Sequence, residues 1–203
     1  MLNTEHRGTL LLVFLIIILS GALWTGVSYW ILTYINRTKN VTFIIAGGLS
    51  TLQYTIGAFA QIAGREFSDR IGRKTILLAG FGAFSVSLFL LTLVPDNFWL
   101  LLGLVAVLGF TFFMTQAPIN ALLGDISHKD TVGVTYGVNF TVKYGIGAIL
   151  PAMTGWIAIN WGLDFVFYFF SALSALAFVI TLIVKEKRQR KAYIPAEIFA
   201  NCL

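Results

Sequence analysis

Long apolar stretches alternate with short polar breaks along the whole chain. Six of the stretches come near or exceed the roughly 20 apolar residues that a helix needs to cross a bilayer. They run over Thr9–Tyr34, Val41–Gly64, Thr75–Val94, Phe98–Leu123, Thr131–Ile157 and Phe165–Val184. The pattern predicts an all-α membrane protein: a transmembrane domain over residues 9–184 with six transmembrane helices, preceded by a short segment over 1–8 and followed by a basic tail over 185–203.

The composition supports a lipid environment. The 203 residues are 58% hydrophobic and only 11% charged, whereas a soluble domain is about one-quarter charged. The net charge of +5 is typical of the positive-inside bias of membrane proteins, so we expect the lipid bilayer as a partner and no nucleic acid. The single cysteine, Cys202, cannot form an internal disulfide or a thiolate metal site alone, and we expect neither a metal nor another cofactor.

The basic residues predict the orientation. If the N-terminus lies inside, most of the 14 Lys and Arg residues fall on inner segments. The positive-inside rule then places both termini in the cytoplasm and the protein in the cell membrane. The first apolar run is too long for the core of a signal peptide, so we expect it to remain as a helix.

Lys143 is the sharpest candidate for function. It lies about twelve residues, or roughly 18 Å, into the fifth predicted helix, close to the bilayer centre. A charge there is costly, so its side chain should face the bundle interior or a wet cavity. No Asp or Glu lies inside the six predicted spans. The partner of Lys143 would then be an anionic substrate or a carboxylate on another half, unless its side chain extends to the membrane interface instead.

Other polar residues near mid-depth extend the candidate substrate site. Tyr136, Asn139, Lys143, Gly147 and Thr154 share one side of the fifth helix at about 100° per residue. Small residues at four-residue spacing, which let helices approach closely, lie on a different side and predict its packing face: Gly133, Gly137, Thr141 and Gly145. Elsewhere, the candidates are Gln53, Gln116 and Trp24. For the two glutamines, the alternative is a hydrogen bond between helices.

One charged motif carries a family resemblance. Asp69-Arg70-Ile71-Gly72-Arg73-Lys74 resembles the conserved loop of the major facilitator superfamily, which joins the second and third helices of a six-helix half. Arg65 stands where the family has a glycine, and Gly64 lies one residue earlier. The run from Gln116 through Asp125, then Gly133 to Pro151, is similar to the fourth and fifth helices of the C-terminal half.

The resemblance implies an architecture and a set of roles. The family fold has two six-helix halves around a cavity, and each half consists of two inverted three-helix repeats. This chain holds one half, so it is a fragment, one part of a split transporter, or a protomer that pairs with a second half or with itself. The resemblance implies that the first, second, fourth and fifth helices line the cavity. It also implies a conformational latch between halves, formed by Asp69, Arg70, Gly72, Arg73 and Asp125.

Within that latch, two contacts are expected. Arg73 pairs with Asp125, and Asp69 interacts with the N-terminal dipole of the fifth helix. The alternative is that the charges of the loop only orient the chain in the membrane.

These observations favour half of a secondary active transporter that moves a small polar or anionic organic solute by alternating access. The alternative is a non-transporting membrane scaffold or accessory subunit. An intramembrane enzyme is disfavoured, because His6 and His128 both lie in predicted polar segments.

Overall fold

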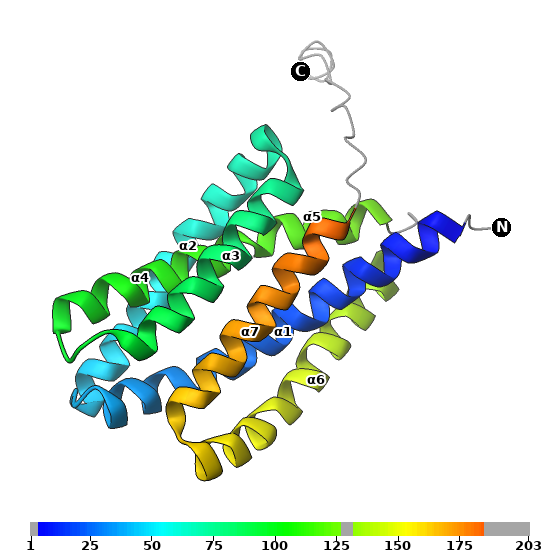
Figure 1. The fold of residues 1–203 in the computed structure, drawn as a ribbon. Coiled ribbons are helices and arrows are strands. Elements are labelled where there is room, and N and C mark those ends of the chain that lie inside the picture. Colours follow the sequence, from blue (N-terminus) through cyan, green and yellow to red (C-terminus); the bar gives the residue numbers. More distant parts are fainter. Residues whose placement is uncertain (1–3, 127–131, 185–203) are drawn as a thin grey trace.

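The computed structural model describes residues 4–126 and 132–184 (Figure 1). All of the regular secondary structure in these ranges is helical: α1 (Thr4–Thr38), α2 (Phe43–Ile71), α3 (Arg73–Leu93), α4 (Phe98–Met114), α5 (Gln116–Ile126), α6 (Val132–Trp161) and α7 (Leu163–Ile183). Six spans are long and apolar enough to cross a membrane, with α4 and α5 together forming the fourth. The predicted all-α class and the six spans are confirmed.

The polar breaks are shorter than the sequence pattern predicted. The expected loop from Arg65 to Lys74 is mostly helical, because α2 continues to Ile71 and α3 begins at Arg73. Only Gly72 lies outside a helix there, with a φ of 111°. Charged residues keep good helix propensity in water, so the helix continues past the apolar stretch and ends where glycine adopts a φ that other residues rarely take. Gly162, with a φ of 97°, separates α6 from α7 in the same way.

The fourth span is broken at Thr115, where its C-terminal third begins. Pro118 has no backbone N–H, so the carbonyl of Met114 lacks its usual helical donor four residues later. At the same place the helix tightens: the Thr115 N–H donates to the carbonyl three residues earlier, that of Phe112, at 3.1 Å. This break places Gln116 at the first residue of α5.

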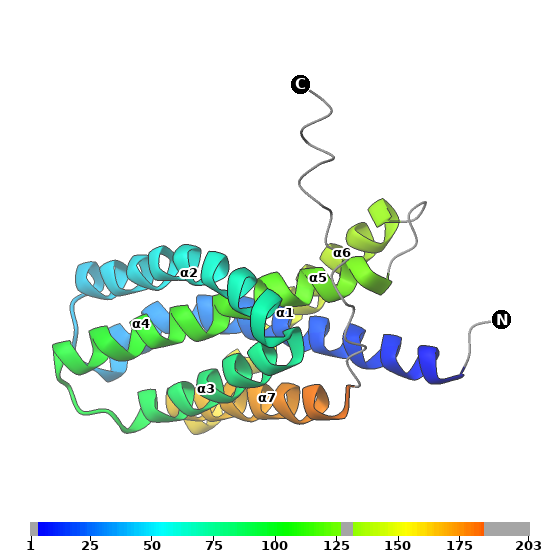
Figure 2. The same cartoon turned by 90° about the horizontal axis from the view of Figure 1, so that it is seen from above.

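The helices form a bundle in which α1 and α4 are flanked by the others. Viewed from above, α2 lies at one edge and the pair α3 and α7 at the opposite edge, with α4 and α1 between them (Figure 2). Reciprocal hydrogen bonds tie that pair together: Ser85 Oγ donates to the Ser171 carbonyl at 2.8 Å, and Ser171 Oγ to the Ser85 carbonyl at 2.9 Å. Such bonds satisfy hydroxyl groups that would be unpaired in lipid.

Of the six spans, α2 and α6 are the least enclosed. Only 28% and 18% of their apolar windows are buried, against 39% to 56% for the other spans. Helix α2 packs on α4 and α1, α6 packs on α1 and α7, and the two do not pack against each other within the described residues. The expected interaction of Asp69 with the N-terminal dipole of α6 stays a prediction.

Candidate functional site

A chain of hydrogen bonds joins α1, α5 and α6. Lys143 Nζ on α6 donates to Gln116 Oε1 at 2.9 Å. The Gln116 amide nitrogen donates to Ser20 Oγ on α1 at 3.1 Å. Ser20 and Gln116 are both buried. Lysine only donates, so the amide orientation of Gln116 follows from this network. The cation thus has a neutral acceptor as its partner, and no acidic group pairs with it among the described residues.

Two glycines bring α1 and α6 together at this cluster. A Cβ at Gly21 would lie 2.9 Å from the Lys143 carbonyl oxygen, and one at Gly147 would strike Thr25, one turn further along both helices. The polar side of α6 is therefore the side that packs on α1. The predicted packing face behaves in the opposite way: nothing lies within 4 Å of a Cβ built at Gly133, Gly137 or Gly145. Within this chain, the small-residue prediction for α6 is wrong, because close approach to α1 requires small residues on the face that holds the lysine.

An aromatic cluster adjoins the polar one. The Trp24 ring stacks on Phe112 with centroids 5.5 Å apart and meets Phe113 edge-on at 4.9 Å and Tyr54 edge-on at 5.2 Å. Offset and edge-on pairs of this kind stabilise by about 0.5–1.5 kcal/mol each beyond the burial of area. The four rings come from α1, α2 and α4, so they fix these helices against one another.

The two clusters form adjacent layers. On α1, Trp24 follows Ser20 by four residues, and on the fourth span Phe113 precedes Gln116 by three. On α1, this spacing places the two side chains on one helix face, roughly one 5.4 Å turn apart. On the fourth span, the break at Thr115 lies between the two residues, so their spacing gives only a displacement along the axis. Helix α1 and the fourth span run in opposite directions, so both spacings displace the aromatic layer towards the same end of the bundle. The predicted candidates Lys143, Gln116 and Trp24 therefore belong to one continuous region.

The other predicted substrate-binding residues lie apart from this contact. Asn139 is one turn before Lys143 on α6 and is buried, and its Oδ1 has no hydrogen-bond partner among the described residues. Tyr136 lies a further turn away, where its hydroxyl donates to the Asn120 carbonyl of α5 at 3.0 Å. Gln53 is buried where α2 crosses α4 at Gly109, again with an unpartnered Oε1. Unpaired buried amides are uncommon and costly.

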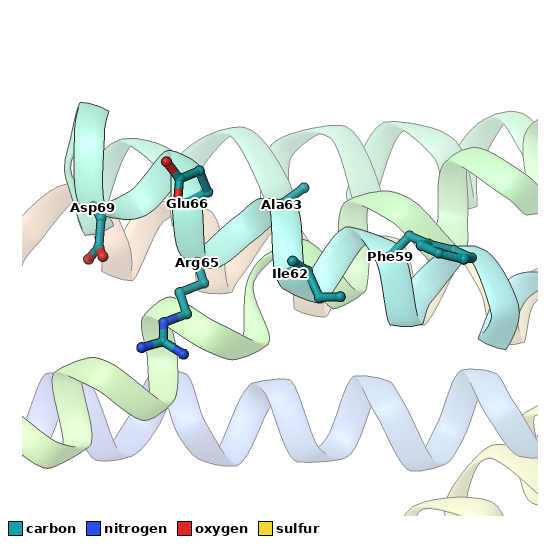
Figure 3. A pocket seen from close by; sticks show the side chains of 6 residues that line it. All are labelled: Phe59, Ile62, Ala63, Arg65, Glu66 and Asp69. Atoms are coloured by element: carbon teal, nitrogen blue, oxygen red, sulfur yellow. The ribbon is translucent and has the colours of Figure 1, made fainter.

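The charged end of α2 presents an open groove of about 670 Å³. Its lining residues are Phe59, Ile62, Ala63, Arg65, Glu66 and Asp69. Arg65 and Asp69 point to the same side of the helix, and Glu66 points to the other (Figure 3). Gly64, beside Arg65, supplies the close packing inside the bundle, since a Cβ there would lie 2.9 Å from the Met114 carbonyl carbon. Arg65 thus faces outward while its neighbour performs the glycine's steric role.

The predicted latch residues have mixed surroundings. Arg70 pairs with Glu66 on its own helix, with a shortest nitrogen–oxygen distance of 2.6 Å, and both side chains are exposed. Asp69 and Arg73 lie on either side of Gly72, and each of them interacts with another group of the protein. The side chain of Asp125 lies outside the described residues, so the expected pair with Arg73 stays a prediction.

Sequence reasoning missed several members of the region. Ser20 and Tyr54 are recognisable only as polar residues at mid-depth, and nothing distinguishes Phe112 and Phe113 from other apolar residues of the fourth span. The available signal was spacing: Ser20 with Trp24, and Phe113 with Gln116, repeat at one helical turn.

Comparisons with known proteins agree on one family. The model of the Major Facilitator Superfamily matches residues 13–198. An uncharacterized MFS-type transporter of Mycobacterium tuberculosis strain H37Rv is 28% identical over 151 residues, covering 73% of this chain and 35% of that protein. The multidrug resistance protein MdtG of Serratia proteamaculans is 31% identical over 144 residues, covering 70% of this chain and 34% of that protein. The solved structure of tetrameric PepTSo2 superposes with a TM-score of 0.71 at 15% identity, over 90% of this chain and 40% of that one.

Proposed function

The chain belongs to the major facilitator superfamily of multi-pass membrane transporters, and from this premise we propose that it forms one half of a secondary active transporter. In this proposal it moves a small polar or anionic organic solute across the cell membrane by alternating access. Lys143 is the main substrate-binding group, and Gln116, Asn139, Tyr136, Gln53 and Trp24 complete the site. The solute interacts with the ammonium group in the space between this half and a second one.

The observation that carries the proposal is the state of Lys143. Its ammonium group lies within a membrane-spanning helix and is held by the amide of Gln116 at 2.9 Å. A neutral acceptor orients the ammonium group but does not neutralise it. An intramembrane charge without a counter-ion is costly, so its retention favours a role in which an anion arrives and leaves.

A second half is the expected partner, because two helices of this one have unfilled faces. On α6, no described residue lies within 4 Å of a Cβ built at Gly133, Gly137 or Gly145. On α2, bulky side chains stand out, with Ile62 and Phe59 more than 70% exposed. A small-residue face accepts large side chains from a neighbouring helix. We therefore expect α6 to receive α2 of the other half, and α2 to reach α6 of that half.

The lengths of the relatives are consistent with this arrangement. The chain spans about a third of the curated relatives that it matches, 35% and 34% in the two cases above. The other half would come from the rest of a longer protein, from a separate chain or from a second copy. A relative named a multidrug resistance protein is compatible with an organic solute.

The charged turn between α2 and α3 would act at the inner face of this assembly. Both termini are proposed to be cytoplasmic, because the basic residues gather on that side. Asp69 and Arg73 would then hold the halves in one state and release them as the halves rock. The N-terminal dipole of α6 would stabilise the Asp69 carboxylate in that state.

Two measurements distinguish this function from that of a passive scaffold. Ile62→Cys and Gly137→Cys, placed in a Cys202→Ser background, should cross-link across the proposed contact in native membranes. Val86→Cys, on the exposed side of α3, is the matched control and should not cross-link. The same assembly in proteoliposomes should show solute flux, and a cross-linked assembly without flux for a panel of organic anions would favour the scaffold.

A further inference from the structure

The aromatic layer next to Lys143 has an unfilled side. The Trp24 ring is enclosed, since Phe112 stacks on it and two further rings meet it edge-on. Tyr54 is different: 43% of it is exposed, and its hydroxyl group makes no hydrogen bond within the described residues. Phe113 is half-buried beside it, with the two centroids 6.3 Å apart. Trp24 therefore holds Tyr54 and Phe113 in position. Phe113 also packs on Gly57 of α2, where a Cβ would meet its ring, so Tyr54 offers most of the ring surface that another molecule can contact.

The spacing of the layers sets the shape of such a molecule. Gln116 Oε1 marks the point where Lys143 offers its proton to an acceptor. Phe113 lies three residues before Gln116, and Trp24 four after Ser20, which corresponds to roughly 4.5–6 Å along the helix axes at 1.5 Å per residue. A ligand that reaches both layers thus has an anionic group and a ring about 5–6 Å apart.

We propose that the solute is an aryl-alkyl anion: a carboxylate or similar oxyanion joined by a short linker to a planar ring. Its oxyanion replaces Gln116 Oε1 on Lys143 Nζ, and its ring lies against Tyr54 and Phe113. One N–H of the Gln116 amide stays on Ser20 Oγ, and the other, which donates to Thr115 Oγ1 at 3.4 Å in the free protein, donates to the bound oxyanion instead. This inference rests on the proposed function, because it narrows the chemistry of the same site.

The charge and the ring of the ligand contribute to binding for separate physical reasons. Hydrogen bonds between two charged groups are the strongest kind, whereas a neutral amide on Lys143 only replaces the equivalent bond to the Gln116 amide, so a neutral ligand with the same ring gains nothing from the Lys143 contact. Aromatic pairs prefer edge-on or offset arrangements, which an aliphatic chain cannot make. An aliphatic anion of similar length therefore keeps the Lys143 contact and loses only the ring contacts.

Three probes separate these contributions in calorimetry on the purified assembly. They are 3-phenylpropanoate, hexanoate without the ring, and 3-phenylpropanamide without the charge. We expect 3-phenylpropanoate to bind two- to tenfold more tightly than hexanoate, the factor that one aromatic contact supplies. The amide should show no measurable binding. Tyr54→Leu should remove the preference for the ring and leave hexanoate affinity unchanged.

Tyr168→Leu is the matched control, since that ring lies on α7 against Phe89 of α3, away from Lys143. It should preserve the two- to tenfold preference. Equal affinity for the two anions, or a preference that survives Tyr54→Leu, would overturn the aryl-alkyl assignment while leaving an anion-binding transporter intact. If neither anion binds, or if binding persists in Lys143→Met, both the assignment and the proposed site are overturned.

Discussion

Replacing Lys143 with methionine separates anion binding from structural support. Methionine has nearly the length of lysine without its charge, so the packing of the side-chain stem over Gly21 is retained. The hydrogen bond lost is the 2.9 Å contact with Gln116 or, with a ligand bound, the contact with its oxyanion. Lys143→Met is therefore expected to weaken anion binding without preventing assembly.

The size of the effect follows from the type of contact. Hydrogen bonds to charged groups contribute about 1.5–3 kcal/mol, which corresponds to roughly 10- to 150-fold in affinity. Two opposing effects determine how Lys143→Met changes the free energy of unfolding. Removing an uncompensated intramembrane charge stabilises the bundle, whereas the Gln116 carbonyl left unpaired costs about 1–3 kcal/mol. These terms nearly cancel, so the melting temperature should change little.

The assay is isothermal calorimetry with 3-phenylpropanoate, paired with thermal unfolding of the same sample. Lys74→Met is the matched control, because Lys74 Nζ donates to the Leu182 and Val184 carbonyls at the end of α7, at 2.6 and 2.8 Å. That variant should lose stability and keep its affinity. Lys143→Arg should bind with intermediate affinity, since the charge persists while its shape and hydration change. Normal affinity in Lys143→Met would remove Lys143 from the binding site.

Three other changes test the packing and the inner turn. Gly64→Ala should destabilise the bundle by about 1–3 kcal/mol in chemical unfolding, because the added methyl group meets the Met114 backbone; wild-type stability would refute the close approach. Tyr34→Phe should cost about 1–3 kcal/mol in the same assay, since the 2.6 Å hydrogen bond to Asp164 is lost and one partner is left unpaired; an unchanged midpoint would show that water replaces it. Asp69→Asn should slow flux in proteoliposomes while calorimetric affinity stays normal, and normal flux would reduce the turn to a topology signal.

The number of spans and the family were both predictable from the sequence, but the ends of the helices were not. Hydropathy indicates which part of a helix is surrounded by lipid, but it does not indicate how far the helix continues into water. Arg65–Ile71 is polar enough to read as a loop, yet it lies in α2, which ends at Ile71, directly before Gly72. The break at Thr115 was readable in principle from Pro118, since a proline removes the hydrogen bond to the carbonyl four residues earlier.

The same holds for the candidate site: features of a single helix were predictable from the sequence, and features that depend on the contact of two helices were not. Helical periodicity correctly separates α6 into a side with Asn139 and Lys143 and a side with Gly133, Gly137 and Gly145. It cannot say which neighbour each side meets, because that depends on Gly21 of α1, more than 100 residues away in the chain. In this half, α1 occupies the lysine side and leaves the glycine side open. The open side then implies a partner. Lys143 lies at the edge of the α1 contact and stays partly exposed, so an anion in the space between the halves reaches its ammonium group.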